Sequence, residues 1–251
     1  LRGGTGKRAR FPWRYWRPEP KEVPTPVSEL INAATMVVAG CYRVARMFPL
    51  YRFAAPDVLT LITYVGAFTA LFAAIIAIRQ TDIKRVLAFS TISQIAYMMV
   101  ALGVSGMGGH AGEGYTASMF HLFTHAFFKA LLFLGAGSVI HAVHSNEMEA
   151  MGGLRKYMPV THWTFLIACL SIAGIPPFSG FFSKDEILSA AFSHDKVVFV
   201  VLLLVAGITA FYMFRLYYRI FWGAERQYEK HPHEAPSVMF IPLVFLALLS
   251  C

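Results

Sequence analysis

Three ionisable side chains lie at helical spacing inside one long apolar stretch of this sequence. His121, His125 and Lys129 recur every four residues within residues 119–140, and almost all of the remaining residues in this range are apolar or small. On a helix, this spacing places all three side chains on one face. Ionisable residues inside membrane spans are costly and usually face a bundle interior or a water-filled cavity. The pattern therefore predicts a proton or ion pathway centred on Lys129.

Imidazole and ammonium groups at this spacing could pass protons along the helix. Histidine titrates near neutral pH, and the side chain of a buried lysine can exist in both charged and neutral forms. A four-residue step is about 6 Å along a helix axis, which is short enough for one bridging water. The alternative is that both histidines are ordinary core residues, packed against Phe120, Phe123 and Phe127.

A metal site is a third possibility for the same residues, because a histidine pair four residues apart can bind a metal ion. No carboxylate or third histidine lies nearby in the sequence, and the cysteines are too scattered to act as ligands. We therefore expect no metal and no bound cofactor on this chain.

A second group of charges follows a predicted break in a helix. Residues 172–186 contain four helix-breaking residues, Gly174, Pro176, Pro177 and Gly180. A broken helix at membrane depth is tolerated only where protein or a cavity satisfies the freed backbone groups. The charged residues that follow are Lys184, Asp185 and Glu186. They could form a site whose charge changes, or they could be the solvated end of the segment.

A third group combines a short charged turn with a polar helix face. Asp82, Lys84 and Arg85 lie in the turn at residues 79–85, and they could simply anchor the next segment at the membrane surface. The polar residues that follow could line a water path or join helix to helix. They are Ser90, Thr91, Ser93 and Gln94.

The composition is that of a polytopic membrane protein. Of the 251 residues, 57% are hydrophobic and 14% are charged, against about 25% charged in soluble domains. The fold class is therefore all-α, a bundle of about seven transmembrane helices, some of them broken. The apolar segments are residues 25–47, 58–79, 84–104, 115–142, 160–183, 197–222 and 236–251.

Lysine and arginine are distributed unequally between the two predicted sides of the membrane. One side receives residues 1–24, 79–85, 143–159 and 215–235, with 16 basic residues, and the other side receives 5. Basic residues favour the cytoplasmic side, so the first side should be cytoplasmic or its equivalent. The net charge of +8 therefore reports orientation, and we expect no nucleic-acid partner.

The distribution of basic and apolar residues divides the chain into two regions. Residues 1–24 form a basic, proline-rich segment, and residues 25–251 form the membrane domain. The sequence begins at Leu1, and the apolar run at 238–250 is too short to cross a membrane alone. We expect a fragment of a longer protein.

Four strings in the sequence resemble the antiporter-like subunit L of NADH–quinone oxidoreductase, respiratory complex I, whose mitochondrial counterpart is the fifth ND subunit. The strings are TDIKRVLAFSTISQIAYM (81–98), FHLFTHAFFKALLFLGAGSVIHA (120–142), MGGLRKYMP (151–159) and GIPPFSGFFSKDEIL (174–188). The resemblance implies a proton-pumping subunit with discontinuous helices and a central chain of lysines and histidines.

Seven residues match the relay positions of that family. The resemblance makes Lys129 the central relay lysine and Lys7 the lysine of the first broken helix. The other matching residues are His121, His125, Lys84, Lys184 and Asp185. The beginning of the chain departs from the family, because Asn32 stands where the family has a histidine and four arginines follow Lys7.

The resemblance also implies where the rest of the machinery lies. NADH, FMN, iron–sulfur clusters and quinone would bind to other subunits. The partners of this chain would be other membrane subunits, the lipid bilayer and protons. The expected location is the bacterial inner membrane, or the inner mitochondrial membrane of an organelle. Two alternatives remain, the large subunit of a multisubunit sodium/proton antiporter and a non-conducting structural subunit.

Overall fold

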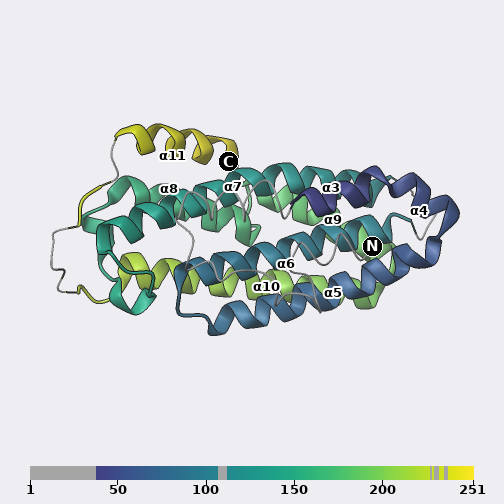
Figure 1. The fold of residues 1–251 in the computed structure, drawn as a ribbon, viewed down its shortest axis with the longest axis horizontal. Helices are drawn as coiled ribbons and strands as arrows, with labels where there is room; N and C mark the ends of the chain where they lie inside the picture. The colour runs from purple at the N-terminus through teal and green to yellow at the C-terminus, as the bar shows by residue number, and fades with distance from the viewer. Residues whose placement is uncertain (1–37, 107–111, 227, 229–231, 235–236) are drawn as a thin grey trace.

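Long apolar helices run side by side along one axis of the molecule (Figure 1). The computed structural model describes residues 38–106, 112–226, 228, 232–234 and 237–251, and within these residues there is no β-strand. The all-α prediction is confirmed. The α-helices of the described residues are α3 (Val38–Arg46), α4 (Phe48–Ala54), α5 (Pro56–Arg79), α6 (Ile83–Val104), α7 (Glu113–Val143), α8 (Pro159–Ala173), α9 (Ser179–His194), α10 (Lys196–Tyr217) and α11 (Ser237–Ser250).

The predicted number of seven membrane crossings is not confirmed. Among the described residues, four helices are long and apolar enough to cross a membrane, namely α5, α6, α7 and α10 with its continuation to Trp222. The predicted segments at 160–183 and 236–251 correspond to shorter apolar helices. Most of the segment at 25–47 lies outside the described residues, as does the whole of the predicted region 1–24.

Helix α6 lies at the centre of the bundle. It contacts α3, α5, α7, α9 and α10, and its side chains are buried almost throughout. Glycine allows the close approach of α5, because a Cβ on Gly103 would lie 2.2 Å from Thr63 Oγ1 and 2.8 Å from Leu59 O. Small residues at such crossings are typical of helix packing in membranes.

The predicted break separates α8 from α9. Helix α8 ends at Ala173, and Gly174 adopts a left-handed conformation with φ of 77°, which costs glycine little. Two details of the prediction were wrong. Gly180 lies inside α9, where its N–H donates to Ser171 Oγ (3.2 Å), and the stretch between the predicted segments 160–183 and 197–222 is helix as far as His194.

Three of the basic segments meet at one end of the bundle, as their predicted placement on one side requires. The turn before α6 pairs with residues 146–148, since Ile83 N–H donates to Asn146 O (3.0 Å) and Met148 N–H to Thr81 O (2.9 Å). Farther along, Tyr157 Oη donates to Glu225 Oε1 (2.9 Å). That bond to the carboxylate raises the pKa of the tyrosine hydroxyl.

Candidate functional site

The ammonium group of Lys129 lies deep inside the helix bundle. The side chain is fully buried, and its Nζ donates a hydrogen bond to Ser90 Oγ on α6. Ser90 in turn donates to Leu87 O (2.8 Å), and the Phe133 ring centroid is 5.8 Å from Nζ. No carboxylate of the described residues pairs with Lys129. Since charges interact strongly in a low-dielectric interior, the protonation of Lys129 should respond to any charge that changes nearby.

His121 makes a hydrogen bond through each of its ring nitrogens. Its Nδ1 lies 2.8 Å from Ser183 Oγ on α9, and its Nε2 lies 3.1 Å from Gln94 Oε1 on α6. Thr124 Oγ1 is 3.1 Å from the same Ser183 hydroxyl. His121 therefore connects three helices through polar side chains, and the ring is completely buried.

His125 is buried to the same degree, but neither of its ring nitrogens has a hydrogen-bond partner among the described residues. Its ring centroid lies 6.2 Å from that of His121 and 5.3 Å from that of Phe128. An unsatisfied buried polar atom costs about 1–3 kcal/mol, so such atoms call for a functional explanation. Packing against Phe123 does not supply one, because Phe123 is 61% exposed and lies on the other face of α7.

Lys184 is buried where the sequence allowed a solvated end. Its Nζ donates to Ile172 O, in the last turn of α8, so the broken helix provides its acceptor. Asp185 and Glu186 are exposed on the described surface. The two residues of the predicted pair therefore differ in burial, since consecutive residues of a helix point in different directions.

Lys84 lies at the first turn of α6 with only 5% of its surface exposed. Asp82 caps this helix by accepting the backbone N–H groups of Lys84 (2.8 Å) and Arg85 (3.2 Å). Ser90 lies six positions after Lys84 in α6, which corresponds to about 9 Å along the helix axis. Lys84 is therefore at the basic end of the bundle, on the helix that also contacts Lys129. Lys7 and Asn32 lie outside the described residues.

Several polar residues of the site were not singled out from the sequence. Ser183 follows the predicted break directly but was not predicted as a site residue, and Thr124 and Tyr97 appeared only within the quoted strings. Tyr97 is buried with its ring centroid 6.2 Å from that of His121, and its hydroxyl has no hydrogen-bond partner among the described residues, like Gln94 Nε2. Tyr97 could have been found from the sequence, because it follows Ser90 and Gln94 at a spacing that places all three on one face of a helix.

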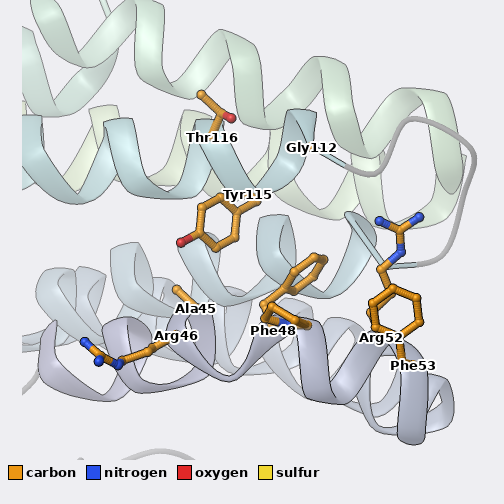
Figure 2. Close-up of a pocket in the computed structure, with 9 residues that line it drawn as sticks. Ala45, Arg46, Phe48, Arg52, Phe53, Gly112, Tyr115 and Thr116 are labelled. Atoms are coloured by element: carbon orange, nitrogen blue, oxygen red, sulfur yellow. The ribbon is translucent and has the colours of Figure 1, made fainter.

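Two other features lie outside this group of residues. No cluster of three or more potential metal ligands occurs in the described part of the chain. A pocket of about 510 Å³ lies where α3 and α4 meet the start of α7, and Figure 2 shows residues that line it. None of the residues that the sequence predicted for the site lines it. Its lining is Ala45, Arg46, Phe48, Pro49, Arg52, Phe53, Gly112, Tyr115 and Thr116.

Comparison with known proteins places the buried lysines and histidines in context. The family model described as NADH:quinone oxidoreductase/Mrp antiporter, transmembrane, matches residues 1–209. The chain belongs to this family. As a member of the NADH:quinone oxidoreductase/Mrp antiporter family, it is a multi-pass membrane protein, and the resemblance found in its sequence is confirmed.

Curated relatives of the chain are named as subunits of oxidoreductases. The chain is 46% identical to the NAD(P)H-quinone oxidoreductase chain 5 of Picosynechococcus, over 99% of this chain and 40% of that protein. It is 49% identical to F(420)H(2) dehydrogenase subunit L of Methanosarcina mazei, over 99% of this chain and 38% of that protein. The chain thus spans about two fifths of the length of these relatives.

Two solved structures share the fold of this chain. A chain of the archaeal membrane-bound sulfane sulfur reductase superimposes with a TM-score of 0.85 at 28% identity, over 99% of this chain and 50% of that one. A chain of the Mrp complex from Dietzia superimposes with a TM-score of 0.86 at 22% identity, over 98% of this chain and 53% of that one. At 22% identity, the similarity to the Mrp chain shows a shared fold and nothing more.

Proposed function

We propose that this chain is the proton-translocating part of a membrane subunit in a complex of the NADH–quinone oxidoreductase type. One observation supports the proposal above the others: Lys129, His121 and His125 are completely buried together on the inner face of α7. A non-conducting bundle gains nothing from them, because buried ionisable groups are costly. Changes of charge on these groups, coupled to quinone reduction elsewhere in the complex, would drive the transfer.

The polar groups are arranged in sequence along the bundle. Lys84 is at the basic end of α6, the Ser90–Lys129 contact is farther along, and the Gln94–His121 contact follows. From His121 the path would continue past the Ser183 hydroxyl, which contacts the imidazole ring, to Lys184 on α9. Asp185 is exposed next to Lys184, so we propose that it faces the outlet or a neighbouring subunit. We also propose Lys7 as an inlet residue, on the resemblance alone.

The electron donor belongs to other subunits in this proposal. The names of two relatives with similar identity specify different donors, NAD(P)H and F420H2. A membrane subunit that only moves protons can serve both kinds of complex, because the redox chemistry takes place elsewhere. We therefore propose that NADH, FMN, iron–sulfur clusters and quinone bind to partner subunits.

The test is substitution of Lys129 in the intact complex. Lys129→Ala should lower proton pumping at least tenfold while the complex still assembles, because the central exchangeable charge is lost. Lys129→Met keeps most of the side-chain volume and covers the case in which the smaller residue disturbs packing. The matched control is Lys196→Ala, whose side chain is exposed at the start of α10.

The outcomes separate the three functions considered. Normal pumping in both Lys129 variants would support the structural subunit and contradict the proposal. Transport that requires sodium in the unmodified complex would support the sodium/proton antiporter, to which the family also extends. Pumping that is lost in the Lys129 variants, retained in the Lys196 variant and independent of sodium would support the proposal.

A further inference from the structure

The hydroxyl of Ser183 lies at the junction between His121 and the broken helix. It is completely buried and within hydrogen-bond distance of three groups, His121 Nδ1 (2.8 Å), Thr124 Oγ1 (3.1 Å) and Gly180 O (3.3 Å). A serine hydroxyl has one hydrogen to donate and two lone pairs with which to accept. The direction of each of these bonds therefore depends on where the other hydrogens are.

Gln94 fixes the arrangement on the opposite side of the imidazole ring. Its carbonyl oxygen faces His121 Nε2 at 3.1 Å, and an amide oxygen can only accept. With the Gln94 amide in this orientation, the Nε2 atom bears a hydrogen whether the ring is neutral or charged. It follows that any proton gained or lost by His121 is exchanged at Nδ1, on the side of α9.

We propose that Ser183 is a positioning residue whose hydroxyl reverses direction each time His121 gains or loses a proton. This inference rests on the proposed function. When His121 is neutral, Ser183 donates its hydrogen to Nδ1 and can accept from Thr124. When a proton binds to Nδ1, the new N–H donates to Ser183 Oγ and the hydroxyl turns to Gly180 O. Ser183 keeps its own hydrogen throughout, so the only net change is one proton on His121.

This arrangement makes both protonation states of His121 acceptable without movement of the helices. Every hydrogen bond in each state uses distances already present in the structure. Since an unpaired buried polar atom is costly, a site that satisfies both states lowers the barrier between them. His125 contrasts with His121, because its nitrogens have no partner among the described residues.

The hydroxyl of Ser183 also connects His121 to the helix that carries Lys184. Ser183 and Lys184 are adjacent in α9, and the Lys184 ammonium donates to Ile172 O at the break. The ionisable groups around His121 are Tyr97 from α6, His125 from α7 and Lys184 from α9. A proton at Nδ1 is therefore placed on the side of the ring that faces α9, the helix of Lys184.

The experiment compares hydroxyl with methyl at position 183 in the intact complex. Ser183→Thr and Ser183→Val have the same shape and differ only in the hydroxyl, so any strain from the extra bulk is common to both. We expect Ser183→Val to lower the pumping rate about five- to tenfold relative to Ser183→Thr, with equal assembly. Ser183→Ala adds no bulk and should be as slow as the valine variant.

Two results would overturn the inference. One is normal pumping in Ser183→Ala, and the other is equal pumping in assembled threonine and valine variants. If the bulkier pair does not assemble, the alanine variant alone decides. Failure here is distinguishable from failure of the proposed function. If Lys129→Met abolishes pumping and Ser183→Ala does not, only the role of Ser183 is wrong; if both variants pump normally, the proton pathway is wrong.

Discussion

Neutral groups accept the hydrogen bonds of the buried lysines Lys129 and Lys184. Lys129 donates to a serine hydroxyl and Lys184 to a backbone carbonyl, and neither is paired with a carboxylate among the described residues. A buried ion pair would hold each lysine firmly in its charged form. Hydroxyl and carbonyl acceptors stabilise the ammonium less, so the lysines can lose a proton at a smaller cost. The choice of neutral partners thus suits groups that must change charge.

Removing the hydroxyl next to Lys129 should slow proton transfer. Ser90→Ala deletes the acceptor of the ammonium, and hydrogen bonds to charged groups contribute about 1.5–3 kcal/mol, so we expect pumping to fall about tenfold or more. The measurement is the proton-pumping rate of the intact complex. Ser138→Ala is the matched control, since Ser138 is buried on α7 and bonds only to Leu134 O (3.1 Å). Equal rates in the two variants would contradict the prediction.

The position of each element was predictable only where the signal is local. Helix α7, the inward face shared by Lys129 and the histidines, and the break after Ala173 follow from short stretches of sequence. The hydrogen-bond partners of His121 do not, because Gln94 and Ser183 are 27 and 62 residues away. The burial of Lys184 was left open for a related reason. Three consecutive charged residues indicate solvent, and only the packing of α9 against α7 places one of them inside.

Helices α8 and α9 meet so closely that the break depends on a residue without a side chain. A Cβ on Gly180 would lie 1.9 Å from Ser171 O and 2.7 Å from Ser171 C, and neither backbone atom can move independently. The contact also includes the bond from Gly180 N–H to Ser171 Oγ. The two helices that flank the break are therefore held against each other at fixed spacing.

Gly180→Ala should separate α8 from α9 and reduce the amount of folded subunit. Overpacking of this kind costs about 1–3 kcal/mol or more, which is enough to lower abundance several-fold. The amount of assembled complex on a native gel measures the effect. Gly207→Ala in α10 is the control, because a Cβ there meets no atom within 4 Å. Normal assembly of the Gly180 variant would show that the close approach can relax.

At the scale of the whole molecule, the basic end is held together by side chains from distant segments. Tyr228 Oη accepts the N–H of Gly152 (2.9 Å) and donates to its carbonyl oxygen (2.5 Å). Glu234 accepts Val160 N–H (2.9 Å) and Thr161 Oγ1 (2.5 Å) at the start of α8. The chain that follows α10 is thereby fastened over the loop that precedes α8. These bonds stabilise the end of the bundle at which we expect proton entry.

Tyr228→Phe should loosen this end locally. The substitution removes both hydrogen bonds to Gly152, at a cost of about 1 kcal/mol, so the exchange of the Gly152 amide hydrogen should become about five- to tenfold faster. Hydrogen exchange read out by mass spectrometry on the peptide containing Gly152 measures the change. Tyr218→Phe, at an exposed tyrosine, should leave that peptide unaffected. An unchanged rate in the Tyr228 variant would mean that other contacts hold the loop.

The pairing between the turn before α6 and residues 146–148 has a consequence for biosynthesis. The backbone N–H of Ile83 and the carbonyl of Thr81 find their partners more than sixty residues later in the chain, at Asn146 and Met148. A ribosome that has made α5 and α6 has not yet made either partner. The hairpin of α5 and α6 therefore enters the bilayer before the turn between these helices has its backbone hydrogen-bond partners. Those hydrogen bonds form only after α7 has been inserted.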